Sequence, residues 1–305
     1  MGKIRGVRFT LIFATLIIAI TAWSLAAGES SWDGRLDVRF VGTPDEVVVE
    51  ILKTAGVNSA DIVYDLGCGD GRIVIAAAKN FGARGVGVDL DPSRIKESTE
   101  NARKAGVLDR VRFIRQDLFQ TDIREATVVT LYLLEELNLR LRPKLLRDLK
   151  PGTRILSHEF TMGEWKPDKQ GIVRNVSIFY QPGSPSVKDT HYYYWVVPAD
   201  VAGEWKLTTT AARGQQDYTL RLVQQFQEIQ GEVKEKGKGA TIRDAKLAGD
   251  QLSFVFRDDG EPQKPILQFK GRVAGDIITG NVSVQRGNSA EDYSWHAKRM
   301  FKPTP

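Results

Sequence analysis

The sequence predicts an α/β domain with a doubly wound, mostly parallel sheet, followed by a small antiparallel β-barrel-like domain. Three observations support this prediction. Short apolar strand patterns alternate with helix patterns between residues 61 and 160, which implies parallel pairing with helices on both faces of the sheet. Beyond residue 198 the helix patterns stop, and short strands follow one another at glycine and aspartate turns. The chain of 305 residues is long enough for two medium-sized domains.

The first domain is predicted to alternate element by element. It opens with a helix over Pro44–Ala55, where Thr43 and Glu46 have the spacing of a capping box. Five strands are then predicted at 61–66, 84–90, 111–117, 126–133 and 153–160, with helices at 71–80, 91–105 and 137–149. Two further strand candidates, at 172–180 and 191–199, are expected to close the edge of the sheet.

The second domain is predicted from a series of strand segments. They lie at 203–209, 217–233, 240–256, 266–284 and 292–300. Gly249 and Gly275, each followed by an aspartate, stand between runs with apolar positions and predict a hairpin at each place. The basic cluster at 233–238 predicts a solvated hairpin turn. Trp205 and Trp295 are expected to close the core of a small barrel.

Composition excludes several classes of function. The chain has 43 basic and 38 acidic residues, a formal net charge of +5. Three of the basic residues lie in the opening segment, and the remaining 40 against 38 acidic residues leave +2, so no nucleic-acid partner is expected. Cys68 is the single cysteine, which excludes an internal disulfide. The three histidines are not spaced as ligands, so no metal site is predicted.

The opening segment has the pattern of an export signal. Three basic residues precede an apolar run over 9–27, and a small-x-small site allows cleavage after Ala26. The run is also long enough for an uncleaved membrane anchor, which would give membrane contact through 9–27. Either alternative places the chain in the cell envelope, exported (periplasmic or extracytoplasmic) or anchored by the N-terminal helix. The predicted domains are 1–27, signal peptide or anchor; 28–39, linker; 40–198, the α/β domain; and 199–305, the β-barrel-like domain.

A glycine-rich loop follows the first strand, in VYDLGCGDGRIV at 63–74. Gly67 and Gly69 fit the first two places of a dinucleotide-binding GxGxxG pattern, but Arg72 occupies the third. Asp65 precedes the loop by two residues, where its charge would repel a bound pyrophosphate and attract a cationic ligand. The sequence contains no GxxxxGK[ST], which excludes a P-loop nucleotide site.

DLGCGDG resembles the cofactor loop of class I S-adenosylmethionine-dependent methyltransferases, which have a Rossmann-like domain. The resemblance continues at later strand ends. VGVDLDP puts Asp89 at the end of the second strand, IRQDLF puts Asp117 at the end of the third, and TLYLLEEL follows the fourth. It covers residues 40–160 and implies that the cofactor is S-adenosyl-L-methionine.

The resemblance also implies roles for residues of this chain. Asp89 is expected to accept from both ribose hydroxyls, Asp117 from adenine, and Asp65 to help hold the cofactor's ammonium or orient the loop. The glycines are expected to let the backbone approach the methionine part of the cofactor. The implied cofactor-binding residues are Thr43, Asp65, Gly67, Cys68, Gly69, Gly71, Asp89, Leu90, Asp117 and Leu118.

Within this class, the chain is similar to the ATP synthase c-subunit type lysine N-methyltransferases. Those enzymes have an aromatic-Val-Pro-Thr-Pro segment that folds over the cofactor, and a loop reading DLGSGDGRIVIAAA. This chain has FVGTP at 40–44, with Gly42 in place of proline, and DLGCGDGRIVIAAA. The implied acceptor is a protein lysine. Residues 200–305 resemble a lipocalin-like bacterial β module, with GEW at the start and WHAKR near the end.

Methyl transfer from a sulfonium needs alignment of the nucleophile more than it needs acid–base machinery. An amine acceptor has to be neutral, and a nearby phenol or carboxylate would assist. Tyr132 and Glu135 are the catalytic candidates, with plain packing and surface roles as the alternatives. Glu159 is a weaker candidate, and His158 is expected to be a satisfied core or rim histidine.

A second function remains open from the sequence. S-adenosylmethionine is made in the cytosol, whereas the leader points outward, so the chain could be a non-catalytic envelope binding protein that retains a methyltransferase-like domain. Its β-barrel would then bind a ligand or a partner. Intact Asp65, Asp89 and Asp117 favour an enzyme, and a measurement of S-adenosylmethionine binding would discriminate the two.

Overall fold

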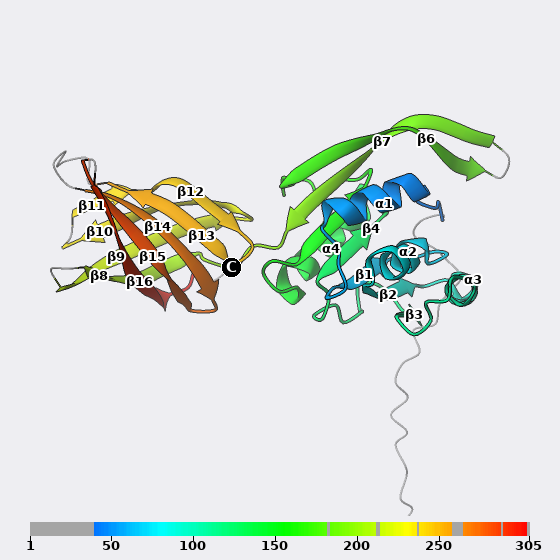
Figure 1. The fold of residues 1–305 in the computed structure, drawn as a ribbon, viewed down its shortest axis with the longest axis horizontal. Helices are drawn as coiled ribbons and strands as arrows, with labels where there is room; N and C mark the ends of the chain where they lie inside the picture. Colours follow the sequence, from blue (N-terminus) through cyan, green and yellow to red (C-terminus); the bar gives the residue numbers. More distant parts are fainter. Residues whose placement is uncertain are drawn as a thin grey trace, which may run out of the picture. The chain divides into compact units, whose positions relative to one another are not determined.

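The computed structural model describes residues 40–181, 184–211, 214–236, 238–257, 265–287 and 289–303. The predicted signal or anchor at 1–27 and the linker at 28–39 lie outside the described residues. The described part of the chain contains two β-sheets (Figure 1). Within the described ranges, no helix is long and apolar enough to cross a membrane.

The first sheet has seven strands in the order β3-β2-β1-β4-β5-β7-β6. Strands β1 to β5 pair in parallel, and β7 runs antiparallel to both β5 and β6. The strands are β1 (Ile62–Leu66), β2 (Arg84–Asp89), β3 (Val111–Arg115), β4 (Val128–Leu131), β5 (Arg154–His158), β6 (Lys169–Gln181) and β7 (Ser184–Val196). The predicted doubly wound, mostly parallel sheet is therefore confirmed, and β6 and β7 close its edge as expected.

Four helices cover this sheet: α1 (Asp45–Thr54), α2 (Arg72–Phe81), α3 (Pro92–Ala105) and α4 (Glu135–Asp148). Successive strand residues point to opposite faces. Val63 packs in one core with residues of α1, α2 and α3, whereas the next residue, Tyr64, packs in the other core with Leu137 and Leu141 of α4. Strands β1, β2, β4 and β5 are thus buried on both faces, as the sequence predicted, whereas the edge strand β3 is partly exposed.

The predicted capping box at the start of α1 is wrong. Pro44 is the N-cap residue, and no side chain caps the helix. The hydroxyl of Thr43 instead lies 3.3 Å from Nδ1 of His158 and makes no hydrogen bond to a backbone N–H of α1. A long-range contact has replaced the local one, which the residue spacing alone does not show.

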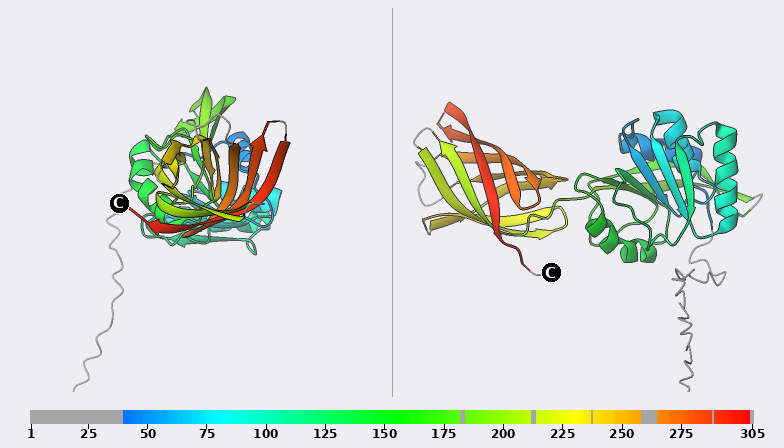
Figure 2. Two further views of the ribbon diagram at one scale, coloured as in Figure 1. Left: turned by 90° about the vertical axis from the view of Figure 1, so that its left-hand side faces the viewer. Right: turned by 90° about the horizontal axis from the view of Figure 1, so that it is seen from below.

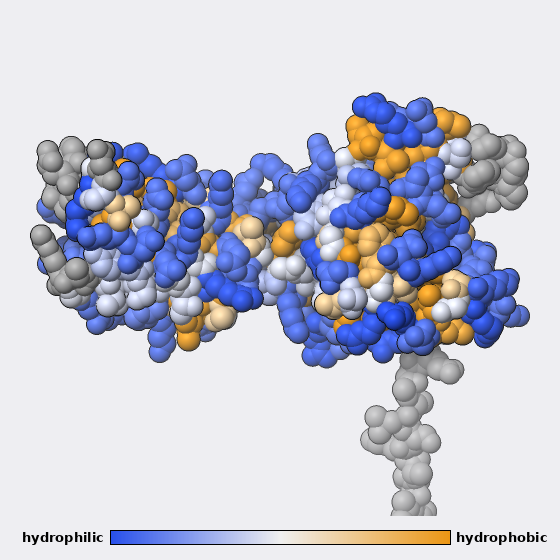
Figure 3. Space-filling model, in the orientation of Figure 1, coloured by the Kyte–Doolittle hydropathy of each residue, from blue (hydrophilic) through white to orange (hydrophobic). Residues whose placement is uncertain are grey.

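Strands β6 and β7 form a long antiparallel hairpin. Their register runs from Lys169 opposite Tyr194 to Gln181 opposite Ser184, so β7 begins earlier than its predicted start at 191. Apolar surface, orange in Figure 3, gathers over this hairpin on the face drawn. Two apolar side chains of the hairpin, Ile172 and Val187, are exposed.

The second sheet has nine antiparallel strands in the order β11-β10-β9-β8-β16-β15-β14-β13-β12. Figure 2 shows it curling into a nearly closed barrel. Ile242, which connects the two end strands of the sheet, donates a backbone hydrogen bond to the carbonyl of Gly231 in β10, at 3.0 Å. The strands are β8 (Gly203–Ala211), β9 (Gly214–Gln225), β10 (Glu228–Glu235), β11 (Lys238–Thr241), β12 (Arg243–Ala248), β13 (Gln251–Phe256), β14 (Ile266–Ala274), β15 (Ile277–Arg286) and β16 (Ser289–Phe301).

The three hairpin turns that the sequence predicted in this sheet are present, and one further hairpin was not predicted. Hairpins form at Gly249 and Gly275, both with positive φ, and at the basic cluster, where Glu235 pairs with Lys238. The segment 217–233 includes a hairpin between β9 and β10, yet neither glycine nor aspartate stands at its turn, residues 226–227. Phe226 adopts a φ of 55° at that turn, a conformation that its sequence does not announce.

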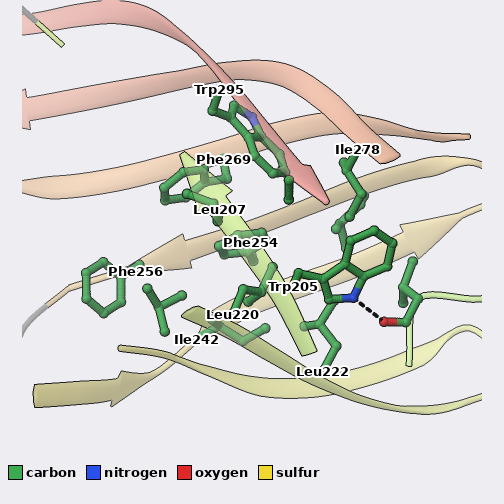
Figure 4. Close-up of a cluster of buried hydrophobic side chains, with 14 of the residues drawn as sticks. Trp205, Leu207, Leu220, Leu222, Ile242, Phe254, Phe256, Phe269, Ile278 and Trp295 are labelled. Atoms are coloured by element: carbon green, nitrogen blue, oxygen red, sulfur yellow. Dashed lines mark hydrogen bonds between the residues drawn. The ribbon is translucent and has the colours of Figure 1, made fainter. Parts of the chain in front are cut away.

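Side chains fill the interior of the barrel (Figure 4). Trp205 and Trp295 are both buried, as predicted, and their indole N–H groups donate to the carbonyls of Val201 and Lys270, each at 2.9 Å. Phe254 stacks on a neighbouring phenylalanine with ring centroids 4.7 Å apart. The interior of this barrel is therefore a packed core.

Candidate functional site

A cavity that is open to solvent lies at the carboxyl ends of β1, β2 and β3. This is the edge at which ligands bind in open α/β sheets. Asp65, Asp89 and Asp117, which end or follow these three strands, all line it. Of the other predicted cofactor-binding residues and catalytic candidates, Thr43, Gly67, Cys68, Leu90, Leu118 and Tyr132 line it, whereas Gly69, Gly71 and Glu135 do not.

Asp65 is a buried carboxylate that lacks the solvation a charge needs. Burial raises its pKa from 3.8 to about 7, against the opposing hydrogen bond that Thr130 donates to it at 2.8 Å. The nearby charges of Asp89 and Asp70 raise the pKa further. A cationic ligand in the cavity would favour the ionised form, so this carboxylate suits a sulfonium or an ammonium group.

Asp89 organises the loop that follows β1. Its Oδ2 accepts from the backbone N–H of Gly69 at 2.8 Å, and its Oδ1 accepts from the backbone N–H of Asp91 at 3.0 Å. Asp117 makes a similar turn, since its carboxylate accepts from the backbone N–H of Phe119 at 2.8 Å. Each carboxylate oxygen has a second lone pair, which leaves both side chains able to accept from a ligand hydroxyl or amine.

Two glycines of the loop make room for side chains of this chain. Gly69 has a φ of 52°, and a Cβ there would lie 2.0 Å from the ring of Phe40. Gly71 has a φ of 80°, and a Cβ there would lie 2.7 Å from Phe113. Of the predicted loop glycines, only Gly67 lines the cavity, so the expected backbone approach to the cofactor applies to that position.

Residues 40–43, here called the strap, border the cavity from the N-terminal side. Arg72 at the start of α2 holds the strap, because its Nη1 donates to the carbonyl of Thr43 at 2.9 Å. The same guanidinium makes a two-pronged ion pair with Asp70, at 2.9 and 2.6 Å. A Cβ at Gly42 would lie 2.5 Å from the guanidinium carbon of Arg72, which gives a physical reason for glycine at this position.

Tyr132 and Glu135, the two catalytic candidates, are placed differently. Tyr132 lines the cavity, and its ring lies 4.0 Å, centroid to centroid, from the ring of His158. The carboxylate of Glu135 accepts from the hydroxyl of Thr161 outside the cavity lining. Of the two, only Tyr132 is positioned to meet a bound ligand.

His158 is a buried histidine with a partner at each ring nitrogen. Its Nδ1 lies 3.3 Å from the hydroxyl of Thr43, and its Nε2 lies 2.6 Å from the hydroxyl of Thr190. Burial lowers its pKa to about 4, so the ring is neutral at physiological pH. Glu159, the weaker candidate, accepts from the same Thr190 hydroxyl at 2.5 Å.

Sequence reasoning missed the part that two residues, Arg72 and Arg94, play in this site. Arg72 counted only against a dinucleotide loop, and its hold on the strap appears only in the structure. Arg94 lies over the ring of Phe40, 4.6 Å from its centroid, and lines the cavity. The aromatic residue at position 40 could be recognised from the sequence, whereas nothing in the sequence indicated a role for Arg94. Within the described ranges, no group of three or more histidine, cysteine or acidic side chains is placed to hold a metal ion.

Residues 65–169, which run from the end of β1 through β5, match the ANTKMT methyltransferase domain family. The chain is also 50% identical over 131 residues to a protein-lysine N-methyltransferase from Saccharolobus islandicus (strain REY15A), a match that covers 43% of this chain and 81% of that protein. The chain belongs to the protein-lysine N-methyltransferase family. It is a methyltransferase, and its cofactor is S-adenosyl-L-methionine, as the sequence predicted.

Other relatives of this methyltransferase match over different shares of their length. The Homo sapiens lysine N-methyltransferase for the ATP synthase c-subunit is 32% identical over 129 residues, which are 42% of this chain and 54% of that protein. A crystal structure of an RNA methyltransferase from Salinibacter ruber, in complex with S-adenosyl-L-homocysteine, is 48% identical. That similarity covers 53% of this chain and 96% of the other, with a TM-score of 0.46.

Proposed function

We propose that this chain transfers the methyl group of S-adenosylmethionine to the side-chain amine of a lysine in a protein. The observation that carries the proposal is the 50% identity to a protein-lysine N-methyltransferase over 131 residues. The acid-lined cavity agrees with it, because both a sulfonium and an alkylammonium are cations that carboxylates attract.

The residues of the cavity divide into two groups under this proposal. Asp89 and Asp117 would hold the cofactor by accepting from its hydroxyls and amine, and Asp65 would face its positive charge. When bound, the cofactor supplies an electrophilic methyl group on a good leaving group. The chain then has to bring a neutral amine into line with that methyl group. Tyr132, on the cavity wall beyond β4, is the side chain that we assign to the acceptor side.

Transfer of a labelled methyl group to protein extract tests the proposal. The full chain, incubated with S-adenosylmethionine labelled at the methyl group and an extract of cellular protein, should yield labelled material that protease destroys and RNase does not. Asp89→Ala serves as the inactive control. Label that RNase removes would instead identify RNA as the acceptor and contradict the proposal.

We further propose that the chain works in the cell envelope. The basic residues and apolar run of the opening segment support this location, with cleavage after Ala26 or retention as an anchor in contact with the membrane. The cofactor would then have to reach the envelope from the cytosol, where it is made. The packed interior of the barrel argues against the alternative in which that interior binds an apolar ligand.

A further inference from the structure

A row of hydrogen bonds runs from the cavity to the edge of the protein. It starts at Thr43 of the strap and passes through both nitrogens of His158 to Thr190 of β7. It ends at Glu159, whose carboxylate accepts from Thr190 and lies 3.2 Å from the amine of Lys188. Thr43, His158 and Thr190 are all buried, so bulk water does not compete for these bonds.

The single hydroxyl hydrogen of Thr190 determines which partner donates in each hydrogen bond of this row. Burial opposes ionisation of Glu159, but hydrogen bonds from Thr190 and Lys188 hold its pKa below the usual value, so its carboxylate only accepts. Thr190 has a single hydroxyl hydrogen, which it gives to Glu159. Nε2 of His158 must therefore carry the hydrogen that it shares with Thr190. The neutral ring then leaves Nδ1 bare, and the hydroxyl of Thr43 donates to it.

We propose that this row of hydrogen bonds makes the hydroxyl oxygen of Thr43 an acceptor for an alkylammonium group in the cavity, with His158 as the positioning residue. The only hydrogen of that hydroxyl is committed to His158, so the oxygen offers lone pairs and no donor. The backbone carbonyl of Thr43 is already occupied by Arg72, at 2.9 Å. Asp65, which also lines the cavity, favours a cation there, whereas the charge of Asp70 is paired with Arg72.

Two alkylammonium groups enter such a cavity, and this inference rests on the proposed function for both. One is the α-ammonium of the cofactor, and the other is the side-chain ammonium of an acceptor lysine. Thr43→Val removes the hydroxyl with little change of shape, and Thr43→Ser restores it. Thr153→Val is the matched control, because Thr153 is buried outside the cavity lining, with its hydroxyl 3.3 Å from the carbonyl of Ala126.

The first experiment measures the cofactor's ammonium by calorimetry on the full chain. Thr43→Val should bind S-adenosylhomocysteine about tenfold more weakly or worse, as expected for a hydrogen bond to a charged group. An analogue that lacks the α-amino group should bind the wild type and Thr43→Val alike. Thr43→Ser and Thr153→Val should bind S-adenosylhomocysteine as the wild type does.

The second experiment measures the acceptor's ammonium. The chain, saturated with S-adenosylhomocysteine, is titrated with N-acetyl-lysine amide and with its norleucine counterpart, and binding is followed by NMR. A loss confined to the lysine compound in Thr43→Val would assign the site to the acceptor. Unchanged affinity in both experiments overturns the proposal. Failure of methyl transfer to protein would leave the calorimetry readable, so the two proposals fail separately.

The role of His158 is tested by the NMR chemical shifts of its ring nitrogens. Ring nitrogen shifts of the wild type, assigned by comparison with His158→Phe, should show a neutral ring with the hydrogen on Nε2 from about pH 5 to pH 8. A hydrogen on Nδ1, or a charged ring at neutral pH, would overturn the derivation without any variant having to fold. His158→Phe, where folded, should reproduce the loss seen for Thr43→Val, and an unchanged affinity would remove His158 from this role.

Discussion

The hydroxyl of Thr43 lies 3.3 Å from Nδ1 of His158, although 115 residues separate the two in the sequence. This contact ties the strap to the end of β5. Arg72 holds the same threonine through its carbonyl, from the start of α2. The strap is thus held at Thr43 by two contacts, one from the end of β5 and one from the start of α2. These contacts place it beside the carboxylates that line the cavity.

Asp89→Ala should weaken S-adenosylhomocysteine binding by about 2–3 kcal/mol, because hydrogen bonds to a charged group are the stronger kind. The substitution also removes the acceptor of the backbone N–H groups of Gly69, which is buried, and Asp91. Calorimetry of the folded variant measures the effect. Asp109→Ala, at an exposed position outside the cavity lining, is the control. An Asp89→Ala affinity equal to that control would remove Asp89 from the site.

Cofactor affinity should depend on pH through Asp65. The pKa of Asp65 is about 7 in the free protein, and a cation binds its ionised form better. Affinity for S-adenosylhomocysteine should therefore rise by up to about tenfold per pH unit below neutrality and level off above it. Titrations across this range should show the rise in the wild type. Asp65→Asn should bind S-adenosylhomocysteine more weakly, and its affinity should not rise with pH. If the affinity of Asp65→Asn still rose with pH, the effect would belong to another group.

Asp65 and His158 should also oppose each other in the pH dependence of stability. The folded pKa of Asp65, about 7, lies above its ordinary 3.8, so its stabilising contribution is full at low pH and is lost as pH rises to about 7. The folded pKa of His158, about 4, lies below 6.5, so its contribution is full above 6.5 and is lost as pH falls. Between these limits the two contributions change in opposite directions.

Asp65→Asn separates the two contributions in the cofactor-free protein. Its free energy of unfolding minus that of the wild type should rise with pH by about 1.4 kcal/mol per unit up to neutrality, and then stay constant. The variant alone should lose stability as pH falls from about 6.5, since His158 is no longer offset. Urea unfolding at several pH values measures both. Parallel curves for the two proteins would show that Asp65 ionises normally.

Much of the site could be predicted because it depends on strand ends. Asp65, Asp89 and Asp117 each come after an apolar run, and parallel strands bring their carboxyl ends to one edge of the sheet. The fold followed from the same alternation. The order of the elements was therefore enough to predict that the three aspartates line one cavity. Their roles were predicted from the resemblance.

The contacts that the sequence did not predict are long-range and made by side chains. Thr43 has the spacing of a helix cap, but its hydroxyl contacts His158, and nothing local distinguishes the two outcomes. In the sequence, Arg72 only showed that the dinucleotide-binding GxGxxG pattern is incomplete. Its ion pair with Asp70 and its hydrogen bond to the strap depend on the three-dimensional course of the loop. Phe226 forms a turn without glycine, so its hairpin left no pattern to find.

The barrel should fold without the α/β domain. Its buried side chains form a cluster of their own, around Trp205, Phe254 and Trp295. A fragment of residues 199–305 should give a cooperative thermal transition and a β-type circular dichroism spectrum. Trp205→Ala in the fragment should lower its stability by about 3–5 kcal/mol, the usual cost of a large cavity. A fragment without a cooperative transition would show that the two domains depend on each other.

Reporter fusions test the proposed location. An alkaline phosphatase fused after Pro198 should be active, because the basic residues before the apolar run keep the N-terminus inside and send the rest outward. A fluorescent protein that needs the cytosol should stay dark at the same junction. Deletion of residues 1–27 should reverse both signals. The reversed pattern in the full chain would place the methyltransferase at the cytosolic face, where its cofactor is made.

The most direct test of the central claim is to map methylated lysines in cells by mass spectrometry. Cells that carry the wild-type chain should contain at least one protein lysine that is methylated, and the same lysine should be unmodified in cells with the gene deleted or replaced by Asp89→Ala. Replacement by Asp109→Ala should restore the modification. If the lysine methylation of every detected protein were identical in all of these cells, while the purified chain still bound S-adenosylmethionine, the chain would not be a protein-lysine methyltransferase.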